Sequence, residues 1–133
     1  MVVFDMLKCY YSDMKKIFWV FFLLIFGIGA FAGEYETALA SGKPVVLYIY
    51  TAYCGYCRKF DPIYDKLSGI HGKSYKFVSL DAGTPYGRYV MWKLGAGYVP
   101  FVLVTDLKNK KAKVINPSCS IEFACADKEL RNF

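Results

Sequence analysis

Two cysteines separated by only two residues, Cys54 and Cys57, are the side chains in this sequence best suited to chemistry. They follow a β-branched and aromatic run at Val45 to Thr51 and precede a helical pattern at Arg58 to Leu67. Cys54 therefore falls at a strand-to-helix turn, where free backbone N–H groups and the helix dipole stabilise a thiolate. We predict that Cys54 is the nucleophile of thiol–disulfide exchange. Cys57, one turn into the helix and less exposed, is then the resolving thiol.

Other interpretations of the cysteines must be weighed, because a Cys-x-x-Cys pair alone is a weak signal and also occurs as half of a zinc site. The other half would be Cys119 and Cys125, whose spacing does not suit a zinc knuckle. A purely structural Cys54–Cys57 disulfide would gain little, because the ring that it closes is short. In one regular helix the α-carbons of Cys119 and Cys125 would lie about 9 Å apart, beyond the roughly 7 Å limit for a disulfide. They can pair only if that segment is not regular helix.

The flanking sequence alternates between helical and strand patterns. A short helix over 34–41 stops at Gly42, and Thr84 and Pro85 are typical of the N-cap and first residue of a helix that runs to Leu94. The other predicted elements are strands at Val45 to Thr51, Tyr75 to Leu80, Phe101 to Thr105 and Lys111 to Ile115, and a last helix from Ser118 or Ser120 to Asn132. This order predicts an α/β fold with a mixed sheet of about four strands covered by helices.

Length and composition limit the chain to a single compact core. It has 133 residues, of which 56% are hydrophobic and 21% charged, which excludes a disordered or fibrous protein. The net charge of +6 is modestly basic. Six of its 17 Lys and Arg residues lie in two short stretches, at Arg58 and Lys59 and between Lys108 and Lys113, without the interleaved aromatic side chains of nucleic-acid binders. We therefore expect no nucleic-acid partner.

The apolar run from Ile17 to Ala32 predicts export. It is shorter than the roughly 20 residues that a membrane-spanning helix needs, it follows Lys15 and Lys16, and it ends in Ala30-Phe31-Ala32, a typical cleavage site. We predict a leader and signal peptide over residues 1–32, with Met14 favoured over Met1 as the true start, and a mature domain over residues 33–133. The alternative is an uncleaved membrane anchor formed by residues 17–32. In either case the domain lies outside the cytoplasm, in the periplasm or cell envelope.

Two segments resemble the hallmarks of the thioredoxin superfamily. TAYCGYCRKFDPIYDKL is similar to its active-site strand, turn and helix, with Pro62 where thioredoxins kink this helix, and LGAGYVPFVLV is similar to its second hallmark, a hydrophobic residue before a cis-proline. The resemblance covers residues 34 to 133. It implies a thioredoxin-like three-layer fold and thiol–disulfide oxidoreductase activity.

The resemblance also implies a substrate site. Pro100 would be cis and lie against the cysteine pair, leaving the backbone of Val99 free to pair with a substrate chain. Tyr53, Tyr56 and Tyr98 would lie near this site as an apolar docking rim. We therefore predict Val99, Pro100, Tyr53 and Tyr56 as substrate-binding residues.

Some positions differ from the thioredoxin pattern. Tyr48 stands six residues before the first cysteine, where thioredoxins carry a buried Asp, and Ser79 takes the place of its Lys partner. A phenol and a hydroxyl cannot accept a proton from Cys57 at neutral pH, so we expect water or another group to do so. Gly-Tyr between the cysteines is similar to periplasmic disulfide isomerases, whereas Val99 before the proline is similar to oxidases. The direction of electron flow is not fixed.

These observations together predict an exported thiol–disulfide oxidoreductase. Its substrates would be proteins with thiols or disulfides, its electrons would pass to or from a membrane redox partner, and it would need no cofactor or metal. The alternative is a thioredoxin-fold binding module, either a chaperone or a carrier in which both thiols hold Cu(I). A further His or Met ligand would favour the carrier, but His71 is expected in a surface loop without nearby ligands, and Met91 is not placed convincingly.

Overall fold

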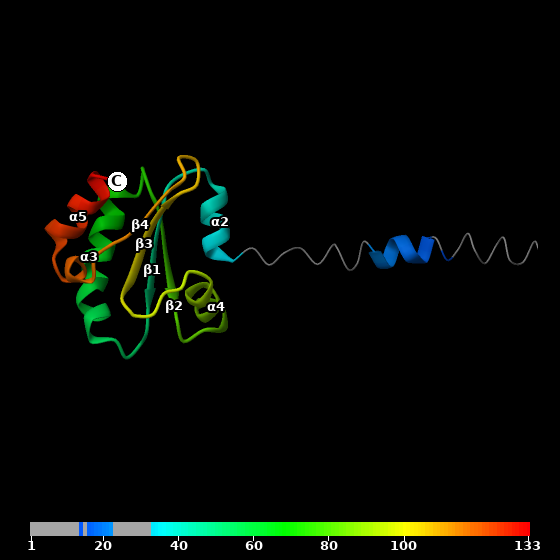
Figure 1. Cartoon of the computed structure of the whole chain (residues 1–133), viewed down its shortest axis with the longest axis horizontal. Coiled ribbons are helices and arrows are strands. Elements are labelled where there is room, and N and C mark those ends of the chain that lie inside the picture. Colours follow the sequence, from blue (N-terminus) through cyan, green and yellow to red (C-terminus); the bar gives the residue numbers. More distant parts are fainter. Residues whose placement is uncertain (1–13, 15, 23–32) are drawn as a thin grey trace, which may run out of the picture. The chain divides into compact units, whose positions relative to one another are not determined.

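The computed structural model describes Met14, residues 16–22 and residues 33–133 (Figure 1). Residues 16–22 are helical and exposed, and no helix in this part of the chain has both the length and the apolar character to cross a membrane. The predicted cleavage site at Ala30-Phe31-Ala32 lies outside the described residues, so signal peptide and anchor both stay predictions. The chain divides into two units, Met1–Ala32 and Gly33–Phe133. The second unit contains the whole sheet.

The sheet has four strands in the order β2-β1-β3-β4. The strands are β1 (Val45–Tyr50), β2 (Lys76–Asp81), β3 (Phe101–Asp106) and β4 (Lys111–Val114). β1 pairs in parallel with β2 and antiparallel with β3, and β4 pairs antiparallel with β3 at the edge. The predicted mixed sheet of four strands, with its closing hairpin, is therefore confirmed.

Helices cover both faces of this sheet, which gives three layers. On one side lie α2 (Glu34–Ala40) and α4 (Pro85–Lys93), and on the other lie α3 (Gly55–His71), the 3-10 helix η1 (Pro117–Ile121) and α5 (Phe123–Arg131) (Figure 1). α4 begins as predicted, because Thr84 Oγ1 accepts a hydrogen bond from the backbone N–H of Gly87. The predicted thioredoxin-like three-layer α/β fold is confirmed.

The side chains of β1 alternate between two cores. Val46 and Tyr48 pack under α3 and α5, whereas Val45, Leu47 and Ile49 pack under α2 and α4. All five side chains are buried. This is the burial that a continuous β-branched and aromatic run predicts for a central strand. The end of β1, from which the cysteine turn begins, is thereby held by packing on both faces.

The predicted last helix, from Ser118 or Ser120 to Asn132, is wrong in its continuity. The chain instead forms η1, becomes extended at Glu122 with φ −134° and ψ 114°, and then forms α5. This interruption brings the α-carbons of Cys119 and Cys125 to 5.0 Å, and the two cysteines form a disulfide. Cys119 and Cys125 therefore pair under the condition that their spacing sets, because the helix is broken between them.

The sequence analysis expected His71 to be an unpartnered residue of a surface loop, and this expectation is wrong. α3 extends four residues beyond Leu67 and ends at His71. Its Nε2 atom lies 2.6 Å from Asp127 Oδ1 on α5, and its side chain is only 14% exposed. Arg131 donates to the other carboxylate oxygen of Asp127 at 2.8 Å. The hydrogen bond from His71 is the main cause that lowers the pKa of Asp127, and the charge of Arg131 adds to it. This cluster joins α5 to the end of α3.

The lowered pKa of Asp127 predicts that this cluster is lost in acid. The pKa in the folded protein lies below the ordinary value of 3.8, so ionised Asp127 stabilises the fold above that pH. The contribution disappears as the pH falls from 3.8 through the folded-state pKa. Asp127→Asn should therefore lower the free energy of unfolding at neutral pH, and its difference from the wild type should shrink below pH 3.8. Urea unfolding over a pH series measures both.

Asp65→Asn is the matched control, because Asp65 is an exposed residue of α3 with no hydrogen bond or ion pair within residues 33–133. Its free energy of unfolding should follow that of the wild type across the series. A constant difference between Asp127→Asn and the wild type down to pH 2 would show that the Asp127 carboxylate contributes nothing through its charge.

Candidate active site

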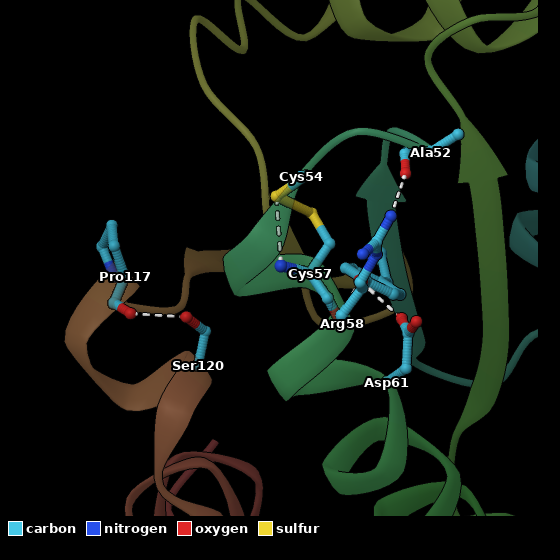
Figure 2. Close-up of a disulfide and its surroundings, with 8 residues drawn as sticks. Ala52, Cys54, Cys57, Arg58, Asp61, Pro117 and Ser120 are labelled. Atoms are coloured by element: carbon cyan, nitrogen blue, oxygen red, sulfur yellow. Dashed lines mark hydrogen bonds between the residues drawn. A yellow bond between two sulfur atoms is a disulfide. The ribbon is translucent and has the colours of Figure 1, made fainter.

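The side chains of Cys54 and Cys57 lie together at the turn that connects β1 to α3 (Figure 2). Cys54 is the N-cap of α3 and has extended backbone angles, φ −86° and ψ 111°, while Cys57 lies in the first turn of the helix. Their α-carbons are 5.2 Å apart and the two sulfurs form a disulfide. The turn that the sequence predicted thus places both sulfurs at the N-terminus of a helix of 17 residues.

The two sulfurs have unequal surroundings. Cys57 is 2% exposed and belongs to the core beneath α3, whereas Cys54 is partly exposed. The backbone N–H of Cys57 donates to Cys54 Sγ at 3.1 Å. In the reduced protein this N–H and the helix dipole stabilise negative charge on Cys54. Cys54 is therefore the sulfur that is both accessible and electrostatically favoured as a thiolate.

Tyr48 lies directly beneath Cys57, at the position where the resemblance implies a buried Asp. Its hydroxyl lies within hydrogen-bond distance of two acceptors that share its single proton, the Cys57 carbonyl oxygen at 3.1 Å and Asp61 Oδ1 at 2.8 Å. Burial, followed by the hydrogen bond to Asp61, raises the pKa of Tyr48 far above its ordinary value of 10.0. The phenol therefore remains a protonated donor. Ser79 is its neighbour on β2 but is exposed and makes no side-chain hydrogen bond with it in the described part of the chain.

Asp61 is the site residue that the sequence analysis missed. It lies one helical turn after Cys57, on the solvent-exposed part of α3, and accepts the Tyr48 hydrogen bond (Figure 2). The four-residue spacing along a predicted helix would have placed it on the same face as Cys57. Asp61 is thus the carboxylate that lies beside the hydrogen bond between Tyr48 and Cys57.

A pocket of about 440 Å³ opens beside the cysteine turn. Tyr56, Val99 and Pro100, three of the four predicted substrate-binding residues, line it together with Tyr98. The opposite wall is η1, through Pro117, Ser118, Ser120 and Ile121. Tyr53, the fourth predicted substrate-binding residue, does not line the pocket and is 97% exposed. The η1 wall was not predicted, because the sequence analysis began a regular helix at Ser118 or Ser120 and expected no 3-10 turn there.

Val99 presents an unpaired backbone at the mouth of this pocket. The Val99–Pro100 peptide bond is cis, and Pro100 is buried just before β3 begins. Neither the N–H nor the C=O of Val99 forms a backbone hydrogen bond with any residue that the structure describes. Both groups are therefore available to a bound chain.

Metal-ligating side chains are not clustered here. Within the described residues no group of three or more His, Cys, Asp or Glu side chains is placed to hold a metal ion. Cys54–Cys57 and Cys119–Cys125 are two separate disulfides and do not form one four-sulfur site.

A mixed sheet between two helical layers, with a Cys-x-x-Cys pair at the N-terminus of a helix, defines a thioredoxin-like thiol–disulfide oxidoreductase. The family model of thioredoxin matches residues 30–116. The chain belongs to the thioredoxin family. No curated relative matches it.

Solved structures agree on the fold at low sequence identity. Thioredoxin F from spinach chloroplast is 24% identical with a TM-score of 0.59, over 74% of this chain and 86% of that one. A thioredoxin from Thermus thermophilus is 20% identical with a TM-score of 0.58, over 74% and 78%. The J-Trx1 fragment of ERdj5 is 19% identical with a TM-score of 0.59, over 74% of this chain but only 48% of the fragment.

The Tyr48 contact predicts a measurable stabilisation of the site. Tyr48→Phe keeps the ring and removes both hydrogen bonds, so it should lower the free energy of unfolding of the oxidised protein by about 1 kcal/mol. Tyr50→Phe is the control, because Tyr50 packs against Tyr48 but its hydroxyl makes no hydrogen bond within residues 33–133. Urea unfolding of both variants measures the difference. Equal losses in the two variants would show that the hydrogen bonds at Tyr48 do not stabilise the fold.

Proposed function

We propose that this oxidoreductase acts outside the cytoplasm on protein substrates, with Cys54 as the attacking sulfur and Cys57 as the resolving sulfur. One observation carries the assignment: Cys54 is partly exposed and accepts the Cys57 N–H at 3.1 Å, whereas Cys57 is 2% exposed. An accessible, stabilised thiolate suits attack on a substrate, and a buried thiol suits intramolecular resolution.

The exchange proceeds in two displacements. The Cys54 thiolate attacks one sulfur of a substrate disulfide, forms a mixed disulfide and expels the other substrate sulfur as a thiolate. The Cys57 sulfur, after losing its proton, attacks Cys54 Sγ, which forms the Cys54–Cys57 disulfide and releases the second substrate thiolate. The substrate gains two electrons and the enzyme loses two. The reverse sequence oxidises a dithiol substrate.

The pocket supports a polypeptide as the substrate. The free N–H and C=O of Val99 can pair with an extended chain, as a strand added to a sheet edge does. Tyr56, Tyr98 and Ile121 give the pocket large apolar walls beside the reactive sulfur. Tyr53, fully exposed beside Cys54, is left to contact substrate outside the pocket.

The cysteine content supports an extracytoplasmic location. The second disulfide, Cys119–Cys125, is of the kind that persists in oxidising compartments and is rare in the cytosol. The apolar run from Ile17 to Ala32 supplies the export signal. A membrane redox partner would then supply or remove the electrons of the Cys54–Cys57 pair.

The sulfur assignment predicts opposite behaviour for two serine variants. Cys54→Ser should abolish exchange with disulfide substrates, because a hydroxyl is a poor nucleophile at sulfur. Cys57→Ser should still attack and accumulate mixed disulfides through Cys54, visible as reductant-sensitive adducts on a non-reducing gel. In the reduced wild type, iodoacetamide at pH 7 should modify Cys54 roughly tenfold faster than Cys57. Mass spectrometry of the labelled peptides gives both rates.

A Cys57→Ser chain that also carries Cys119→Ser and Cys125→Ser is the control, since it retains only Cys54 in the domain. It should trap the same adducts. A Cu(I) carrier would instead lose metal equally in both single variants, because both sulfurs would be ligands. Equal alkylation rates without trapped adducts would overturn the assignment.

The export proposal predicts where the mature chain begins. Protein made in an exporting host should start at Gly33, because the small residues Ala30 and Ala32 mark the cleavage site. Ala30→Leu should block processing, whereas Phe31→Leu, which leaves both small residues in place, should not. Mass spectrometry of the recovered protein measures the N-terminus. An intact Lys15 to Ala32 segment in the membrane fraction would instead establish an anchor.

A further inference from the structure

The outer surface of α4 carries two aromatic and two cationic side chains. Arg88, Tyr89, Trp92 and Lys93 are all exposed, Trp92 by 78% and Tyr89 by 50%. Trp92 lies four residues after Arg88 and three after Tyr89, and Lys93 lies four after Tyr89, so all four side chains share one side of the helix. Gly87 and Val90 are buried on the other side. We call these four residues the α4 outer face.

The charges of the α4 outer face are not compensated. Neither Arg88 nor Lys93 forms an ion pair within the described part of the chain, whereas Lys113 and Arg131 pair with Glu129 and Asp127. Lys93 Nζ lies 5.9 Å from the centre of the Tyr89 ring, and the Tyr89 and Trp92 rings lie 6.4 Å apart. The face is therefore a small aromatic cluster bordered by positive charge.

The chain enters the domain beside this helix. Gly33, the first residue after the apolar run, lies so close to the ring of Tyr86 that a Cβ atom there would collide with it. The Tyr86 hydroxyl accepts a hydrogen bond from the Tyr35 N–H at 3.0 Å and donates to the Glu36 carboxylate. The start of the domain is thus held at the first turn of α4.

We propose that the α4 outer face lies on the surface of an anionic lipid bilayer. Tyr and Trp side chains are favoured at the depth of the headgroups, and Arg and Lys are attracted to anionic lipids. The apolar run that directly precedes Gly33 in the sequence, Ile17 to Ala32, brings the chain to a membrane during export, whether or not it is then cleaved. This surface is separate from the site of thiol exchange.

The proposed contact leaves the cysteine pair accessible. α4 covers one side of the sheet, and α3, whose N-terminus carries Cys54 and Cys57, covers the other (Figure 1). η1, the far wall of the pocket, lies in the same layer as α3. A domain resting on α4 therefore exposes its pocket to proteins in solution.

Trp92 reports directly on this contact. The sequence has two Trp residues, Trp19 and Trp92, so a full-length Trp19→Phe chain has Trp92 as its only tryptophan. Reconstituted into vesicles with brominated anionic lipid, it should show blue-shifted emission and strong quenching, both weakened by salt. In vesicles of brominated zwitterionic lipid the quenching should be several-fold smaller.

Removal of the two cations tests the charge contribution. Arg88→Gln with Lys93→Gln should reduce the ratio of lipid-bound to free domain roughly 25-fold, since each cation near an anionic surface contributes about a fivefold preference. Lys108→Gln with Lys110→Gln is the control, because it removes the same charge at the β3–β4 turn, far from α4 (Figure 1). It should leave the quenching unchanged.

Three outcomes would overturn the proposal. They are an unquenched Trp92 in both lipids, equal quenching in both lipids, and equal loss of quenching in the two double variants. Exchange activity through Cys54 is measured on the same samples and should be equal in all chains. A change in quenching is then separate from any failure of the fold or of the proposed oxidoreductase function.

Discussion

Because β1 pairs with β2 on one side and with β3 on the other while helices cover both of its faces, its backbone cannot shift without breaking two ladders and two cores. The cysteine turn starts from the end of this strand. The position of Cys54 at the N-terminus of α3 therefore depends on the most restrained element of the protein. Pro100 immediately precedes β3, the antiparallel neighbour of β1, so the same restraint sets the mouth of the pocket.

Tyr48 places a neutral phenol, and not a carboxylate, in the core beneath Cys57. A carboxylate in the core must be desolvated, whereas a phenol that stays protonated is buried without charge. The carboxylate that accepts its hydrogen bond, Asp61, is on the exposed side of α3 and keeps its hydration. The hydrogen-bonded group beneath Cys57 thus includes a carboxylate, that of Asp61, without placing a charge in the core.

Local patterns predicted the features that depend on neighbouring residues. The strand at Val45, the Thr84 N-cap and the place of Cys54 at a helix start all follow from spacing along a few residues. The Asp61 contact and the joining of His71 to Asp127 depend on which elements the fold brings together, 13 and 56 residues apart. The break at Glu122 also escaped prediction, because the apolar and polar spacing around it is compatible with a continuous helix. Interactions between distant segments decide such positions, and a single sequence does not record them.

β4 is an edge strand whose four residues are all exposed, and Lys111 and Lys113 alternate along it. Unpaired edges invite other strands, and lysines on an edge oppose such pairing because a second strand would bring their charges together or bury them. A protein that crosses a membrane unfolded must rebuild its sheet among many other refolding chains. For the export proposed above, the lysines of β4 would act against such misassembly at this edge of the sheet, away from the Val99 backbone at which substrate pairing is proposed.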